Sequence, residues 1–224
     1  MLTESSLQFL EDLKANNNRD WFLENKKKYE FYKKDYHQLV GQFLAVLKPV
    51  DASLELLEIK NCTFRINRDI RFSKDKSPYK THLSIWISSG SKGLNRAGYY
   101  IHIDKKECLI AGGIYCPEAT DLKKIRKEIA FFYDDLEIIL NNKNFKKEFG
   151  QFDKTEINTL KNAPKDFEKD HIAIEFLKLK SFTATHKFDI SEVTKPDFVT
   201  KITHKLTLLK PLNDFINRAL TAEE

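Results

Sequence analysis

Hydrophobic residues near the start of the chain recur every three or four positions, which is the spacing of one face of an α-helix. Thr3 can cap a first helix, and the three asparagines at positions 16–18 end it. A second, longer helix is predicted to begin at Asn18 or Asp20 and to end at Pro49. The first fifty residues are therefore expected to be helical.

From about residue 61 the hydrophobic positions recur every second residue, which is the period of a half-buried β-strand. Short turns separate the successive strands, so an antiparallel meander is predicted over about residues 61–115. Gly112 and Gly113 fall inside its last apolar run, where glycine indicates a bulge or a close approach of another group to the backbone. The strands are predicted over 64–72, 83–87, 97–104 and 107–115.

After Pro117 the helical spacing returns, although Ser181–Phe188 predicts a strand or an extended arm. This order of helices, strands and helices predicts an α+β fold, in which N-terminal and C-terminal helices pack on an antiparallel sheet. We expect a single domain over residues 1–224, with helices in 1–50, the sheet in 57–116 and a helical part in 118–224.

Composition narrows the class of protein. Hydrophobic residues make up 41% of the 224 positions and aromatic residues 12%, which excludes a disordered chain. No secretory signal or membrane-spanning stretch is evident, and three irregularly spaced cysteines (Cys62, Cys108 and Cys116) fit neither a disulfide framework nor a zinc site. These features predict a cytoplasmic protein with reduced cysteines and no membrane partner.

The net charge of +5 is local to one segment. Residues 60–82 hold seven of the 38 basic residues and two of the 33 acidic ones, so basic and acidic residues balance in the remaining 201 positions. Three of the seven arginines, Arg65, Arg68 and Arg71, also lie in this segment. The rest of the chain uses mainly lysine, so clustered arginine indicates a need for the planar guanidinium fork, which pairs bidentately with carboxylate or phosphate.

Strand alternation over 64–72 would place Arg68 among apolar neighbours, where a guanidinium needs a carboxylate or a bound anion. The first hypothesis is therefore an anion site for a phosphorylated or carboxylated small molecule, built on a strand over 65–71 and a loop over 73–80. Tyr79 is a candidate proton donor in it. The candidate ligand-binding residues are Arg65, Arg68, Asp69, Arg71, Asp75, Lys76, Tyr79 and Lys80.

Two alternatives remain open on the same residues. Arginine and aspartate in one strand often form an internal ion-pair lattice, and the protein would then be a non-enzymatic interaction domain. A basic segment with the aromatic residues Phe72, Tyr79 and Trp86 also suits nucleic acid, although +5 is mild for a duplex-binding protein.

Other motifs are sparse. Neither phosphate-binding loop, G-x-x-x-x-G-K-[ST] or G-x-G-x-x-G, is present, and no motif indicates a cofactor. His82 and His102 lie in neighbouring predicted strands, with Asp104 two residues further on, so the three could bind a metal ion if they share a face of the sheet.

The run Arg65-x-x-Arg68-Asp69-x-Arg71-Phe72, followed by Asp75-Lys76-x-x-Tyr79-Lys80, resembles the signature of a widespread bacterial family of uncharacterised function. Further residues that resemble the family's pattern, and that we regard as candidates for positions around the site, are Arg19, Trp21, Tyr100 and Arg126. The resemblance covers nearly the whole chain and implies one cytosolic domain. It implies no activity, substrate or cofactor.

Overall fold

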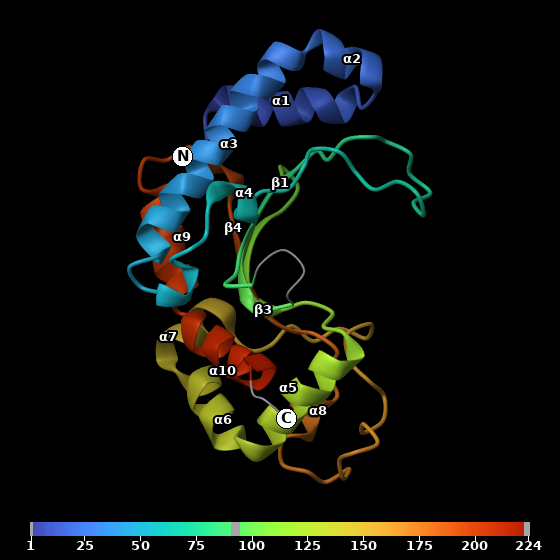
Figure 1. Ribbon diagram of the computed structural model, residues 1–224, viewed down its shortest axis with the longest axis vertical. Coiled ribbons are helices and arrows are strands. Elements are labelled where there is room, and N and C mark those ends of the chain that lie inside the picture. Colours follow the sequence, from blue (N-terminus) through green and yellow to red (C-terminus); the bar gives the residue numbers. More distant parts are fainter. Residues whose placement is uncertain (1, 91–94, 222–224) are drawn as a thin grey trace. The chain divides into compact units, whose positions relative to one another are not determined.

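The computed structural model describes residues 2–90 and 95–221. Its sheet contains β1 (Leu83–Ile87), β2 (Gly98–Ile103), β3 (Cys108–Ile114) and β4 (Phe182–Phe188), which are antiparallel and lie in the order β1-β2-β3-β4. Helices precede and follow the sheet strands in the sequence (Figure 1). The predicted α+β class is therefore confirmed.

Contacts divide the chain into two compact units. The first contains the described residues up to Ile87, together with Tyr100–Ile110 and Lys187–His204. The second contains Ser88–Tyr99, Ala111–His186 and the described residues from Lys205 onward. The expectation of a single domain stays a prediction.

The helices of the first unit follow the predicted capping pattern with one correction. Thr3 caps α1 (Glu4–Ala15), as expected, because its side chain accepts a hydrogen bond from the Ser6 amide. The predicted long second helix is two helices, since Asn25 interrupts it with a non-helical backbone and its side chain donates to the Trp21 carbonyl over 2.9 Å. The other helices here are α2 (Arg19–Glu24), α3 (Lys26–Leu47) and α4 (Ile59–Cys62), with a 3-10 turn at Ala52–Leu54.

Helix α3 forms the core of the first unit through an apolar stripe that includes Leu39, Val40 and Phe43, each fully buried. Tyr36 on the same stripe has a structural hydroxyl, which donates to the Ser84 carbonyl over 2.5 Å and accepts from the Phe64 amide over 3.0 Å. This hydroxyl ties β1 to the beginning of the arginine-rich segment. Its pKa lies well above the usual range because the ring is buried, so it remains a neutral hydroxyl.

The second unit is mainly helical. Its elements are α5 (Ala119–Phe131), α6 (Tyr133–Asn141), α7 (Lys143–Phe149), α8 (Ile174–Leu177) and α10 (Lys210–Thr221). The remaining elements of the chain are α9 (Phe198–Thr207) and a 3-10 turn at Ile190–Glu192. No helix in the described parts of the chain has the length and apolar character needed to cross a bilayer.

The two glycines of β3 confirm the predicted close approach. A Cβ atom on Gly113, whose φ is +109°, would lie 1.9 Å from the Phe182 carbonyl oxygen, so only glycine fits beside β4. A Cβ atom on Gly112 would lie 2.8 Å from the Leu209 side chain. Strand β4 therefore packs closely against the glycines of β3. It comes from residues 182–188, which lie outside the predicted meander of 61–115.

Candidate functional site

Residues 63–82 form a two-branched arm that leaves α4 and returns to β1 (Figure 1). The Arg68 amide donates to the Pro78 carbonyl over 2.9 Å and the Lys80 amide to the Ile66 carbonyl over 2.8 Å. The predicted strand over 64–72 is therefore wrong: the described arm contains no regular strand, and its branches pair as an isolated β-bridge between Asn67 and Tyr79. The physical reason is that the outgoing branch has only the short return branch to pair with, and side chains near the tip bind backbone amides instead.

The arm is anchored at its root by Tyr79, whose residue surface is 9% exposed. The Asn17 side chain donates to the Tyr79 carbonyl over 2.9 Å and accepts from the Tyr79 amide over 3.1 Å. The Phe22 ring stacks on the Tyr79 ring with a centroid distance of 4.1 Å. Tyr79, our candidate proton donor, is thus packed against residues 17–22, the segment that contains the candidates Arg19 and Trp21. In that segment Trp21 stacks on Phe9, with ring centroids 6.2 Å apart, and Arg19 is exposed at the start of α2.

Two of the three clustered arginines have separate carboxylate partners within the arm. Arg68, whose side chain is 26% exposed, donates to Asp75 over 2.5 Å and to the Ser77 carbonyl over 3.1 Å. Arg71 forms a bidentate pair with Asp69, over 3.0 and 2.6 Å, on the exposed surface. The expected partner of Arg68 is therefore present, but Asp69 orients only Arg71, and the two guanidinium groups do not converge on one ligand.

Hydrogen bonds and the arginine charges favour the ionised form of both acidic partners, Asp75 and Asp69. Asp75 accepts hydrogen bonds from the Ser77 amide and hydroxyl, over 2.9 and 2.6 Å, and these bonds, together with Arg68, lower its pKa to about 2. The Asp69 pKa is lowered as well, mainly by hydrogen bonds from Arg71. Both carboxylates therefore stay ionised at physiological pH, as their pairing with Arg68 and Arg71 requires.

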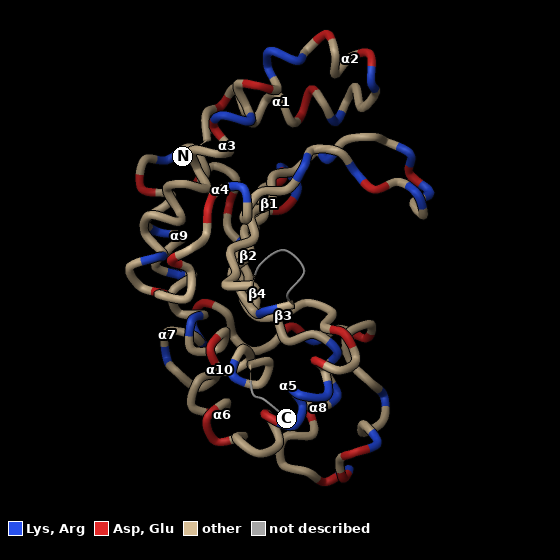
Figure 2. The backbone as a smooth tube through the Cα atoms, viewed as in Figure 1, with Lys and Arg blue, Asp and Glu red and all other residues tan. Residues whose placement is uncertain are grey.

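The unneutralised charge of the arm lies on other residues. Figure 2 shows both signs of charge along the arm. Within the described residues, four of its basic side chains form no ion pair: Arg65, Lys74, Lys76 and Lys80. Lys76 donates instead to the Ile70 carbonyl over 3.0 Å. At the root, Lys80 donates to the Arg65 carbonyl over 2.8 Å and lies 5.3 Å from the centroid of the Phe64 ring.

Two like charges are therefore neighbours at the root. Burial and the nearby charge of Arg65 both lower the pKa of Lys80, with burial the larger cause. Both causes disfavour the charged form of Lys80. The sequence pointed to this segment, but the pairing that leaves Arg65 and Lys80 outside the arm's ion pairs depends on the folded arm.

A second group of polar side chains lies where the arm returns to the sheet. The predicted metal candidates His82, His102 and Asp104 are brought together, with one ligand atom of each within 4.8 Å of the others. The two imidazole rings have centroids 4.7 Å apart. Burial lowers the pKa of both histidines, which favours the neutral imidazole form.

Two hydroxyls join this group. Tyr100 lies two residues before His102 on β2, and its hydroxyl oxygen is 3.1 Å from His102 Nδ1. Ser84 on β1 lies 2.9 Å from the Tyr100 hydroxyl and 3.3 Å from His102 Nδ1. Tyr100 is a candidate by resemblance, whereas Ser84 was not predicted. The signal that could have identified Ser84 is its position two residues after His82 on an alternating backbone.

Arg126, the remaining candidate, belongs to the second unit. Its guanidinium donates to the Leu179 carbonyl over 3.0 Å, and burial lowers its pKa. Its contact within that unit thus joins α5 to the segment that leads into β4.

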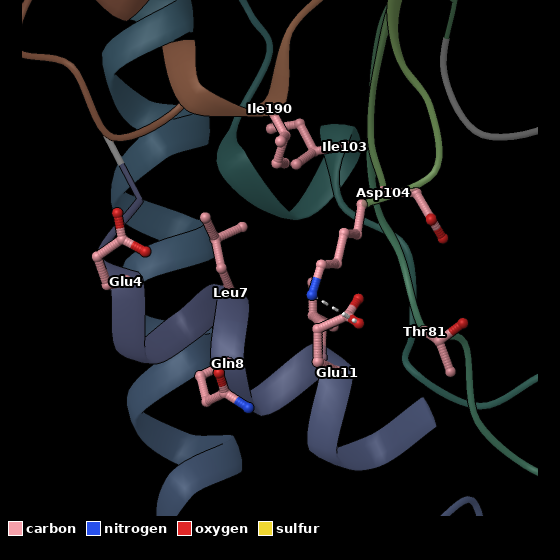
Figure 3. A pocket seen from close by; sticks show the side chains of 10 residues that line it. Glu4, Leu7, Gln8, Glu11, Thr81, Ile103, Asp104 and Ile190 are labelled. Atoms are coloured by element: carbon pink, nitrogen blue, oxygen red, sulfur yellow. Dashed lines mark ion pairs between the residues drawn. The ribbon is translucent and has the colours of Figure 1, made fainter. Parts of the chain in front are cut away.

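A cavity of about 220 Å³ in the first unit lies between α1 and the end of β2 (Figure 3). Thr81 and Asp104 line one part of it, and the dashed line in Figure 3 marks the ion pair between Glu11 and Lys105, at 3.5 Å. This volume is below the ~300–1,000 Å³ typical of pockets for drug-sized ligands. None of the three clustered arginines lines the cavity.

Comparison with known proteins gives one family. The family model described as "Conserved hypothetical protein (DUF2461)" matches residues 5–215. No curated protein and no solved structure matches the chain. Because the match spans nearly the whole sequence, the chain belongs to the DUF2461 family of conserved hypothetical proteins.

Proposed function

We propose that the root of the arm recognises an anionic group, a phosphate or a carboxylate, on a small molecule. The observation that carries the proposal is the pair of neighbouring cations Arg65 and Lys80, neither of which forms an ion pair among the described residues. Asp69 feels the charge of Arg65 but is paired with Arg71. Two like charges repel each other, and partial burial of one of them adds a desolvation cost. An anion placed between them offsets both terms.

The other two arginines of the motif support this site by shaping the arm. Arg68 spans the two branches through Asp75 and the Ser77 carbonyl, so it fixes the return branch from which Lys80 projects. Arg71 and Asp69 neutralise each other near the tip. The proposed anion therefore binds Arg65 and Lys80. Of the three arginines that the sequence suggested as anion ligands, only Arg65 keeps that role in the proposal.

The direct test is a titration of EDTA-treated protein with inorganic phosphate, followed by the NMR shifts of backbone amides in a phosphate-free buffer. Arg65→Gln and Lys80→Gln each remove one charged hydrogen-bond donor, so we expect phosphate to bind about tenfold more weakly in each variant, or worse. Arg71→Gln is the matched control, because it removes a guanidinium that is also exposed but already has a partner.

The control is expected to bind phosphate within about twofold of the wild type. The proposal fails if phosphate shifts no amide at the arm root, or if Arg71→Gln weakens binding as much as Arg65→Gln does. The second result would indicate a general effect of positive charge.

A second candidate function concerns the tip of the arm. Phe72 is 96% exposed there, and the Arg71 guanidinium lies 5.9 Å from its ring centroid. An exposed aromatic ring beside cations suits stacking on the bases of single-stranded nucleic acid. Salt-sensitive retention on single-stranded DNA that is lost in Phe72→Ala would support this function, and equal retention of both proteins would exclude the tip as its site.

A further inference from the structure

Three side chains of different elements meet beside the root of the arm. His82 precedes β1, His102 lies on β2, and Asp104 follows β2. We propose that these three residues form a binding site for a divalent transition-metal ion, with Zn²⁺ as the representative ion. The proposal does not depend on the anion site, because it uses neither Arg65 nor Lys80.

The spacing of the ligand atoms is close to what an ion needs. One atom from each residue lies within 4.8 Å of the others. An ion with bonds of about 2.0–2.1 Å in tetrahedral geometry holds its ligand atoms about 3.3 Å apart. Imidazole and carboxylate side chains can rotate about χ1 and χ2, which brings their ligand atoms closer together.

The surroundings of His102 match those of a metal-binding histidine. Such a residue commonly donates its second ring N–H to an oxygen, which fixes the tautomer and the ring orientation. Here Nδ1 lies 3.1 Å from the Tyr100 hydroxyl and 3.3 Å from Ser84 Oγ. When Nδ1 carries the proton and donates it to these oxygens, Nε2 presents its lone pair to the ion.

The carboxylate of Asp104 is mostly buried, with a side-chain exposure of 15%. One oxygen, Oδ1, accepts from the Lys106 amide over 2.8 Å and lies 3.5 Å from the Lys14 ammonium. The described residues donate no hydrogen bond to the other oxygen, Oδ2. Asp104 is therefore oriented through Oδ1 and has a second oxygen for an ion.

The donor set selects the class of ion. Two imidazole nitrogens and one carboxylate oxygen suit Zn²⁺ and other late first-row metals, whereas Ca²⁺ and Mg²⁺ take oxygen ligands. Three protein ligands leave at least one position open, which is the arrangement found in catalytic zinc sites. The site is thus suited to hold an ion that also contacts a ligand from solution.

The test uses the full chain, stripped with EDTA and kept in a phosphate-free buffer, and measures Zn²⁺ binding by calorimetry. We expect one ion per chain, and at least about 100-fold weaker binding in His82→Ala, His102→Ala and Asp104→Asn, because loss of a ligand costs more than loss of its supporting hydrogen bond. His37→Ala is the matched control, since His37 lies on α3, and it should bind Zn²⁺ like the wild type.

A measurement on the wild type avoids any doubt about the folding of these variants. The imidazole ¹⁵N resonances of His82 and His102 should shift when Zn²⁺ is added, while that of His37 should not. Tyr100→Phe retains the ring and removes the hydroxyl, so we expect it to alter the tautomer of His102 and to weaken Zn²⁺ about 10- to 100-fold. The proposal is overturned if Zn²⁺ leaves the resonances of His82 and His102 unchanged, or if the three ligand variants bind it as tightly as the wild type.

Discussion

Asn17 holds the arm by a pair of hydrogen bonds to one backbone unit, so Asn17→Ala tests how the arm is fixed. The substitution removes the 2.9 Å bond to the Tyr79 carbonyl and the 3.1 Å bond from its amide. Each such bond contributes about 1 kcal/mol net, and a group left partly buried without a partner costs somewhat more. We therefore expect the arm to open about 2–3 kcal/mol more easily.

Hydrogen exchange measures this opening locally. The amides of Arg68 and Lys80 bond across the two branches, so their exchange reports separation of the branches. A loss of about 2–3 kcal/mol corresponds to exchange about 30- to 150-fold faster at these two amides. Amides of α3, such as that of Leu39, should exchange at the wild-type rate.

Asn16→Ala is the matched control, because the Asn16 side chain bonds the Asp12 carbonyl at the end of α1 and, among the described residues, no group of the arm. Its exchange at Arg68 and Lys80 should equal that of the wild type. Unchanged exchange at these amides in Asn17→Ala would refute the reasoning, since the arm would then be held by other contacts, such as the stacking of Phe22 on Tyr79.

Three further predictions concern other parts of the molecule. Gly150→Ala meets open space at a positive φ and should lose about 1–3 kcal/mol in urea unfolding, whereas Gly113→Ala adds a clash with the backbone of β4 and should lose more or fail to fold. The pKa of Asp75 lies below that of an unfolded aspartate, so its ion pair should contribute fully above pH ~4 and be lost as the pH falls through about 2; a carboxyl NMR titration with a midpoint near 4 would contradict this. Lys14→Ala removes the cation beside Asp104 and should tighten Zn²⁺ binding about two- to fivefold in calorimetry, while Lys105→Ala, whose partner is Glu11, should leave it unchanged.

The helical and strand periodicities of the hydrophobic residues predicted most of the fold. Thr3 as a cap, the strand at 83–87 and the close approach at Gly113 are all confirmed, because each depends on local chemistry that a short stretch of sequence contains. The break at Asn25 was missed, since the apolar positions on both sides of it continue with helical spacing.

The arm shows why the rest could not be predicted. Alternating apolar positions such as Ile66 and Ile70 are typical of a strand. A strand also needs a partner strand along its length, and the sequence alone does not reveal that this segment lacks one. The partner of Arg68 is Asp75, seven residues away across the arm, whereas its sequence neighbour Asp69 pairs with Arg71. Likewise, the sequence could suggest His82 and His102 as a pair of metal ligands. Whether they lie side by side depends on the register between neighbouring strands, which the sequence does not give.

The origin of β4 governs when the sheet can form during synthesis. Strand β3 ends at Ile114 and pairs with Phe182–Phe188, so its outer edge has no native partner until the ribosome has delivered that segment. Pairing across such a sequence separation is slow, because the loop must close before the contacts form. An unpaired strand edge is also a template for association with other chains. The nascent chain is therefore most prone to aggregation while the helices of the second unit are being made, and truncation before residue 182 should give an insoluble product.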